Sequence, residues 1–175
     1  KARKILELGA GNGSNSAYLA QLNPAIKFLS LDLSKKSLRK FNTISNFEQL
    51  LGDYHDLSAY KNDSIDLIFA IETICHSSQK DRVIKEAYRK LKKEGLLIIF
   101  DGYMIKELKK LTGDEKLAKV LVEKTMAVDN FENVKDFEKI ISGSNFALLE
   151  KEDLTQYVLP SMRRFEKLAL LFYKL

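Results

Sequence analysis

The sequence contains little of what secreted and membrane proteins contain. Its 175 residues include one cysteine, Cys75, two prolines and no tryptophan. A single cysteine excludes an intramolecular disulfide, so we expect a reduced, cytoplasmic protein. No apolar run approaches the roughly 20 residues that a membrane-spanning helix needs, and no signal-peptide pattern is present.

The charge is only mildly basic, with 29 Lys and Arg residues against 24 Asp and Glu residues. Most lysines fall on expected helix faces among acidic residues, whereas a nucleic-acid footprint would cluster on one face. We therefore expect a partner other than nucleic acid. The length and the 45% hydrophobic share fit a single globular domain over residues 1–175. Because the chain starts without Met and almost directly on an apolar strand, we expect it to be part of a longer protein.

Short apolar runs alternate with helical patterns through the first hundred residues. This alternation predicts an α/β fold with a doubly wound, mostly parallel sheet. The predicted strands are residues 5–8, 26–31, 47–51, 65–71 and 96–100. The predicted helices between them are residues 15–22, 35–41 and 81–91.

The alternation breaks after Tyr103, where the pattern indicates a helical insertion. We expect helices at 105–111 and 116–126, within a cap segment at 104–130 that covers an edge of the ligand cleft. A helix at 134–141, a sixth strand at 146–154 and a helix at 160–173, with Pro160 in its first turn, complete the prediction.

A glycine-rich turn follows the first strand. Gly9, Gly11 and Gly13 lie between that strand and a helix, with Glu7 two residues before the first glycine. Glycines let the backbone approach a ligand closely, and the helix that follows offers unpaired N–H groups. Asp32 ends the second strand, where a carboxylate can accept both ribose hydroxyls. Since ligands bind at the carboxyl ends of such strands, the pattern predicts a nucleoside-like cofactor.

Two cofactor classes share these features. A dinucleotide site uses G-x-G-x-x-G, but Ser14 fills the position of the last glycine, and Glu7 disfavours a nearby pyrophosphate. A carboxylate there suits a cofactor with a positive charge or an amino group. An NAD(P)-dependent oxidoreductase stays as the alternative, although we find no hydride-transfer site.

The stretch ELGAGNG at residues 7–13 resembles the first motif of class I S-adenosylmethionine-dependent methyltransferases. LDLS at 31–34, GDY at 52–54, SIDLI at 64–68 and LKKEGLL at 91–97 resemble later segments of that family, with Lys93 and Glu94 replacing the usual Pro and Gly. The resemblance implies a Rossmann-like fold and S-adenosylmethionine as cofactor. It also implies that Asp32 and Leu33 lie at the ribose, that Asp53 accepts from the adenine amine, and that Tyr54 packs on the base.

The stretch FAIETICH at 69–76 resembles small-molecule methyltransferases, sterol C-methyltransferases among them. That resemblance implies that Ala70 and Ile71 line the cofactor, whereas Glu72 and His76 face a small-molecule acceptor. We expect direct displacement of the methyl group, with His76 as general base; alternatively, His76 caps the following helix. Glu72 would orient His76, bind the acceptor or stabilise positive charge. A protein that binds the cofactor without transferring its methyl group is a further alternative.

Other candidate residues have plainer interpretations. Asp53, His55 and Asp56 match no metal-ligand spacing, so we predict a solvated loop and no metal site. We expect Cys75 to be a small buried hydrophobe and Tyr88 to pack in the core. Asp101 and Tyr103 are expected at the border of the acceptor pocket. The family's usual seventh strand is not visible after Tyr173, so we also expect an incomplete C-terminus.

Overall fold

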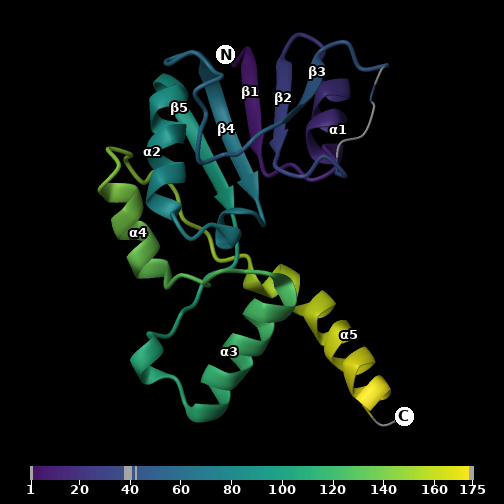
Figure 1. Cartoon of the computed structure of the whole chain (residues 1–175), viewed down its shortest axis with the longest axis vertical. Helices are drawn as coiled ribbons and strands as arrows, with labels where there is room; N and C mark the ends of the chain where they lie inside the picture. The colour runs from purple at the N-terminus through teal and green to yellow at the C-terminus, as the bar shows by residue number, and fades with distance from the viewer. Residues whose placement is uncertain (1, 38–40, 42, 174–175) are drawn as a thin grey trace.

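A parallel sheet forms the centre of the upper part of the molecule in Figure 1. The computed structural model describes residues 2–37, 41 and 43–173, and within them five strands pair in the order β3-β2-β1-β4-β5. Every pairing is parallel. The strands are β1 (Lys4–Leu8), β2 (Lys27–Asp32), β3 (Phe47–Leu51), β4 (Ile65–Ile71) and β5 (Leu91–Phe100). The strand order reverses beside β1, as a doubly wound sheet requires.

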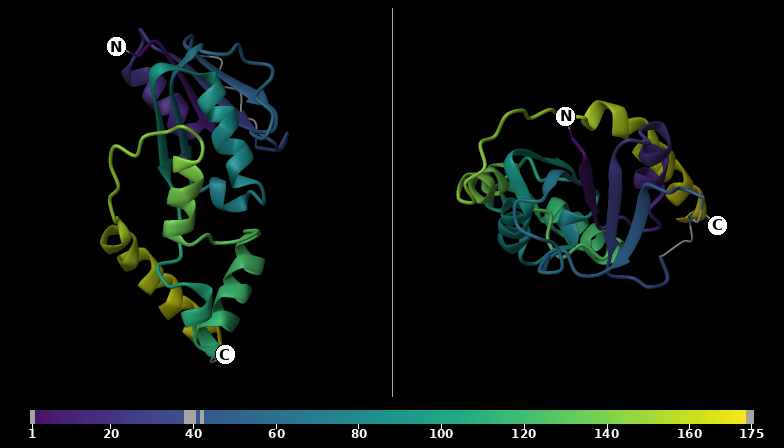
Figure 2. Two further views of the ribbon diagram at one scale, coloured as in Figure 1. Left: turned by 90° about the vertical axis from the view of Figure 1, so that its left-hand side faces the viewer. Right: turned by 90° about the horizontal axis from the view of Figure 1, so that it is seen from above.

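Each inner strand sends alternate side chains to two separate cores. Leu6 and Leu8 belong to the core cluster that includes side chains of α2 (Lys80–Lys90) and α4 (Val134–Ser142). Ile5 belongs to a second cluster, together with Ala17 and Ala20 of α1 (Ser14–Leu22). Helices therefore cover both faces of the sheet, as Figures 1 and 2 show, and the predicted doubly wound fold is confirmed.

The predicted elements of the sheet are confirmed to within a few residues, except for the helix at 35–41 and the start of the last strand. β5 begins at Leu91, directly after α2, and not at Leu96. An irregularity in its pairing with β4, between Ile65 and Leu67, accommodates the extra residues. Lys35, Lys36 and Ser37 form a turn, and residues 38–40 of the predicted helix lie outside the described residues.

The helical part of the chain lies beyond the carboxyl ends of the strands (Figures 1 and 2). It contains α3 (Gly113–Met126) and α5 (Thr155–Tyr173). A capping box starts α3, because the Thr112 hydroxyl accepts from the Glu115 N–H while the Glu115 carboxylate accepts from the Thr112 N–H. A single parallel bridge between Met104 and Asn133 closes the base of the insertion.

Two predictions for the segment after β5 are wrong. The helix expected at 105–111 is only a 3₁₀ turn, η2 (Leu108–Lys110), beside which Lys109 and Lys110 both pair with Glu107. The strand expected at 146–154 is absent: the segment pairs with no described strand, and the Leu149 side chain is 79% exposed. A short apolar run such as residues 146–149 forms a strand only where a neighbouring strand completes its hydrogen bonds.

The last helix starts earlier than its proline suggests. α5 begins at Thr155, whose N–H donates to the Asp153 carboxylate, so Pro160 lies inside the helix and not in its first turn. Among the residues that the structure describes, no helix combines the length and the apolar character needed to cross a bilayer.

Candidate functional site

The glycine-rich turn has a backbone that other residues adopt only with strain. Gly9, Gly11 and Gly13 all have positive φ, at 59°, 54° and 74°. A Cβ atom at Gly9 would lie 1.8 Å from Thr73 Oγ1, so the turn packs directly against the end of β4. The turn therefore lies directly against the segment that follows β4, the strand that pairs with β1.

Asp32 joins this turn to the end of β2. Its carboxylate accepts from the Gly11 N–H at 2.7 Å and from the Ser34 N–H at 2.8 Å. The next side chain, Leu33, is 72% exposed and borders the same edge. A carboxylate held by two backbone N–H groups stays at this edge with a fixed orientation.

Asp53, Tyr54 and His55 follow β3 on the same side of the sheet. The half-exposed Asp53 carboxylate accepts from the His55 N–H at 2.8 Å and contacts His55 Nδ1 at 2.6 Å. Burial opposes ionisation of Asp53, but these hydrogen bonds outweigh it and lower its pKa. Burial raises the pKa of Tyr54 to about 12, and the charges of Asp53, Asp101 and Asp32 add to that rise.

Glu7 differs from the other two acids that the sequence groups with it. Its side chain is 2% exposed, and its carboxylate accepts from Ser16 Oγ at 2.6 Å, from the Ser16 N–H at 3.2 Å and from Asn15 Nδ2 at 3.1 Å. Burial raises its pKa, although these hydrogen bonds oppose the shift. The Glu7 carboxylate thus binds N–H and O–H groups in the first turn of α1 and stabilises the start of that helix. Direct contact of Glu7 with a cofactor stays a prediction.

The end of β4 carries Ala70 and Ile71, which are expected at the cofactor, and is followed by Glu72, which is expected at the acceptor. Ala70 is fully buried in the core, whereas Ile71 is 37% exposed at the edge. Glu72 is exposed and has a positive φ of 49°, which turns the chain sharply away from the sheet. Its N–H donates to the Phe100 carbonyl at 2.8 Å.

His76 ends a short 3₁₀ helix, η1 (Ile74–His76), and contacts the helical part of the chain. Its Nδ1 lies 2.9 Å from the Ala127 carbonyl, and a carbonyl only accepts, so Nδ1 carries the proton. Nε2 of the neutral ring then keeps its lone pair, as a base requires. Among the described residues, His76 makes no hydrogen bond to Glu72, and Gln79 precedes α2, so His76 does not cap that helix.

Asp101 organises the end of β5. Its carboxylate accepts from the Cys75 N–H at 2.9 Å. Cys75 is buried, as expected, and burial together with Asp101 raises the pKa of its thiol to about 12. A thiol with so high a pKa is a poor nucleophile at neutral pH.

Tyr103, which follows Asp101, packs against Phe137 with ring centroids 5.0 Å apart, and burial raises the pKa of Tyr103.

Two interpretations of single residues need correction. Tyr88 is 46% exposed and packs edge-on against Phe146, so it is not a core residue. The loop of His55 is not simply solvated, because Nε2 of the ring lies 2.7 Å from the buried Ser77 hydroxyl. Sequence analysis missed this contact, since 22 residues separate the partners and no motif links them.

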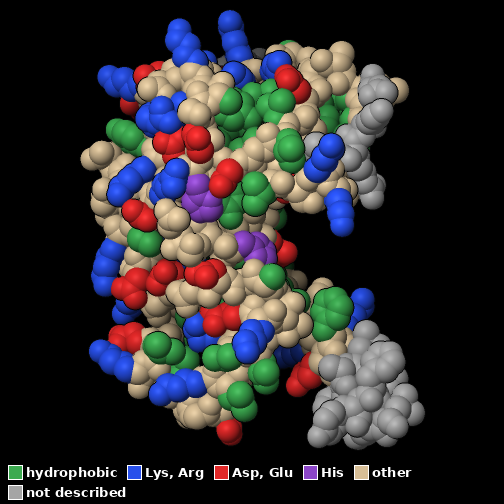
Figure 3. All heavy atoms as spheres, viewed as in Figure 1, with side chains coloured by type: hydrophobic (Ala, Val, Ile, Leu, Met, Phe, Trp, Pro, Cys, Tyr) green, Lys and Arg blue, Asp and Glu red, His purple; other side chains and the backbone are tan. Residues whose placement is uncertain are grey.

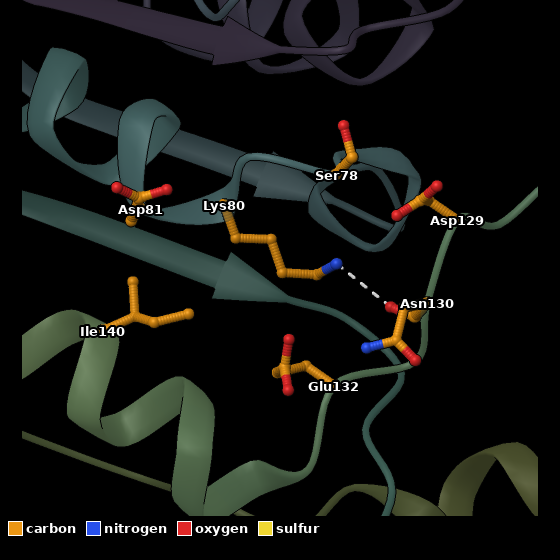
Figure 4. Close-up of a pocket in the computed structure, with 7 residues that line it drawn as sticks. All are labelled: Ser78, Lys80, Asp81, Asp129, Asn130, Glu132 and Ile140. Carbon is orange, nitrogen blue, oxygen red and sulfur yellow. Dashed lines mark hydrogen bonds between the residues drawn. The ribbon is translucent and has the colours of Figure 1, made fainter.

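Two hollows lie in the part of the chain that the structure describes (Figures 3 and 4). Figure 3 shows a hollow on its right-hand side, between the part that contains the sheet and the start of α5. A cavity of about 140 Å³ lies where α2 begins and is lined by Lys80, Asp129 and Asn130 among others. Figure 4 shows these lining residues. This cavity lies apart from the glycine-rich turn.

The known proteins that this chain resembles are methyltransferases. Residues 6–99, more than half of the chain, match the model of a methyltransferase domain. The sterol methyltransferase-like 3 protein of Botryococcus braunii is 29% identical over 105 residues, which are 57% of this chain and 26% of that protein. The glycine/sarcosine/dimethylglycine N-methyltransferase of Actinopolyspora halophila is 26% identical over 161 residues, 89% of this chain and 27% of that protein.

A solved structure adds the same fold. The arsenic(III) S-adenosylmethionine methyltransferase of Chlamydomonas reinhardtii superposes with a TM-score of 0.70 at 22% identity, over 82% of this chain and 51% of that one. The chain spans about a quarter of the length of the two curated relatives named above.

Proposed function

Since this chain belongs to the class I S-adenosylmethionine-dependent methyltransferases, we propose that it binds S-adenosylmethionine and transfers its methyl group to a small-molecule acceptor. The cofactor lies at the carboxyl ends of β1, β2 and β4. The acceptor lies between that edge and the helical part of the chain.

One observation carries the proposal: Asp32 and the glycine-rich turn form one hydrogen-bonded unit. The Gly11 N–H holds the Asp32 carboxylate at 2.7 Å, beside a backbone that leaves no room for a side chain at Gly9. A carboxylate in that position suits two vicinal hydroxyls of a ribose. Asp53 and Tyr54, on the next loop, add an acceptor and an aromatic ring for the base.

The protein's part in the reaction is mainly positioning. The cofactor supplies an electrophilic methyl group on a sulfonium, which a nucleophile attacks without a covalent enzyme intermediate. The chain therefore holds cofactor and acceptor in line and excludes water. Nε2 of His76 takes a proton from the acceptor where one is lost, and the exposed Glu72 carboxylate binds the acceptor or a developing positive charge.

Titration calorimetry tests the cofactor. We expect saturable binding of S-adenosylhomocysteine and none of NAD. Incubation with methyl-labelled S-adenosylmethionine and either a metabolite extract or total RNA then tests the acceptor, and label is expected in small molecules. Binding of NAD alone contradicts the proposal. Label in RNA contradicts the acceptor class, and tight cofactor binding without any label transfer contradicts the activity.

A further inference from the structure

The connection between β4 and α2, residues 72–79, contacts both the proposed cofactor edge and the helical part of the chain. On one side, the Thr73 carbonyl accepts from the Tyr54 hydroxyl at 3.4 Å, and the Thr73 side chain abuts Gly9. On the other side, His76 Nδ1 contacts the Ala127 carbonyl, which directly follows α3. One short segment therefore contacts the cofactor edge and the base of the helical insertion.

Two sets of hydrogen bonds meet at Ser77, one at its hydroxyl and one at its backbone carbonyl. Asp53 Oδ1 lies 2.6 Å from His55 Nδ1, and His55 Nε2 lies 2.7 Å from Ser77 Oγ. Lys80 Nζ then donates to the Ser77 carbonyl at 2.8 Å and to the Asn130 carbonyl at 3.0 Å. Figure 4 shows the Lys80 side chain reaching across the cavity to Asn130.

The last link reaches α3 itself. Lys119 of α3 donates to Asn130 Oδ1 at 2.9 Å, and the Glu123 carboxylate accepts from the Phe131 N–H at 2.8 Å. Segment 127–133, between α3 and α4, is therefore held by α3 on one side and by Lys80 and His76 on the other. Its position fixes where α3 stands relative to the sheet.

The central links are buried, which makes them costly to leave incomplete. Ser77 is 1% exposed and Lys80 is 6% exposed. Lys80 makes no ion pair among the described residues; its ammonium donates to these two carbonyls, in a cavity that Asp129 and Glu132 also line. A buried ammonium in such surroundings is stable only in the arrangement that supplies these acceptors.

We propose that His55, Ser77 and Lys80 are positioning residues that link cofactor contact at Asp53 to the docking of segment 127–133 and α3. The linkage rests on the proposed function, since it needs a cofactor at Asp53. Anything that fixes Asp53 and His55 also favours the docked segment, and the docked segment favours cofactor binding by the same factor.

Hydrogen exchange of the chain with and without S-adenosylhomocysteine tests the linkage. In the unaltered chain, the ligand is expected to slow exchange of amides 127–133. Lys80→Met keeps an apolar stem of similar length but removes the donor, so the slowing should disappear and affinity for the ligand should fall about fivefold or more. Lys85→Met, on the exposed face of the same helix, is the matched control and should change neither.

A second variant separates linkage from simple loosening. Ser77→Ala breaks the contact with His55, and also the bond of 3.0 Å that the hydroxyl accepts from the Gln79 N–H, but leaves the carbonyl that binds Lys80. Exchange at 127–133 without ligand should therefore stay near that of the unaltered chain, whereas the ligand-dependent slowing should be lost. This variant decides the question by itself if Lys80→Met does not fold.

The outcomes distinguish this inference from the function on which it rests. Failure of the unaltered chain to bind S-adenosylhomocysteine overturns the proposed function, and the linkage with it. Normal binding, with the same slowing at 127–133 in the Lys80→Met and Ser77→Ala variants, overturns the linkage alone.

Discussion

The sheet and the helical insertion of this protein are stabilised in different ways. Four of the five residues of β1 are buried, whereas none of the 14 residues of α3 is. α3 depends on a capping box and on surface pairs such as Lys106 with Glu115, and Leu117 and Leu121 stay more than half exposed. The sheet thus has its own core, while the insertion is held in place by the few contacts at its base.

The largest expected difference between the two parts comes from a matched pair of leucines. Leu6→Ala removes a fully buried side chain from the sheet and should lower the free energy of unfolding by about 2–5 kcal/mol. Leu121→Ala, at 55% exposure on α3, should change it by about 0.5 kcal/mol or less. Urea denaturation measures both. Equal losses would contradict the proposed contrast.

A matched pair of glycines sharpens the contrast at the backbone. Gly9→Ala combines a positive φ with a collision with Thr73, and backbone strain alone should cost about 1–3 kcal/mol. Gly113→Ala, in the first turn of α3, meets no atom within 4 Å. It should be neutral or stabilise the chain by up to about 1 kcal/mol. Thermal unfolding distinguishes the two, and a tolerated Gly9→Ala would show that the turn is not as tight as described.

The smallest expected effect is a pH dependence that belongs to the sheet. Burial raises the pKa of Glu7 above its ordinary value of 4.5. Just above pH 4.5 the folded chain therefore keeps a proton on Glu7 that the unfolded chain has lost, so the contribution of Glu7 to stability falls as pH rises through that window. The Glu7→Gln variant has no ionisable group at this position, so it lacks this pH-dependent contribution to stability.

Urea denaturation at several pH values measures it. The unfolding free energy of the unaltered chain, minus that of the Glu7→Gln variant, should fall as the pH rises above 4.5. A difference that is constant or that rises with pH would mean that burial does not dominate at Glu7.

The sheet could be predicted from the sequence more accurately than the segments that follow it. Strands such as β4 are continuous apolar runs that end at turn residues, because both faces of a parallel sheet are covered, and they were found with correct bounds. The segment 146–154 has a strand-like pattern but no neighbouring strand, and pattern alone does not reveal whether a partner exists. The predicted start of α5 at Pro160 was also wrong, because a proline pattern does not reveal a contact such as that of the Thr155 N–H with the Asp153 carboxylate, at which the helix begins.

The candidate site was predictable where it follows the strand ends. Asp32 and the glycines lie together because carboxyl ends of parallel strands share one edge, and their spacing shows this in the sequence. The contacts of Glu7 with Ser16 and of His55 with Ser77 depend on how side chains pack between elements. No spacing rule contains that information, so no pattern in the sequence predicted that His55 bridges two loops.

The central claim, that Asp32 holds the ribose of the cofactor, is tested most directly by calorimetric titration of S-adenosylhomocysteine into two matched variants. Asp32 and Asp66 each accept from two backbone N–H groups, but Asp66 lies at the opposite edge of the sheet. Asp32→Ala should weaken binding by about 1–3 kcal/mol, the scale of a lost charged hydrogen bond, while Asp66→Ala leaves the affinity unchanged. Equal affinities of the Asp32→Ala variant and the unaltered chain would contradict the account.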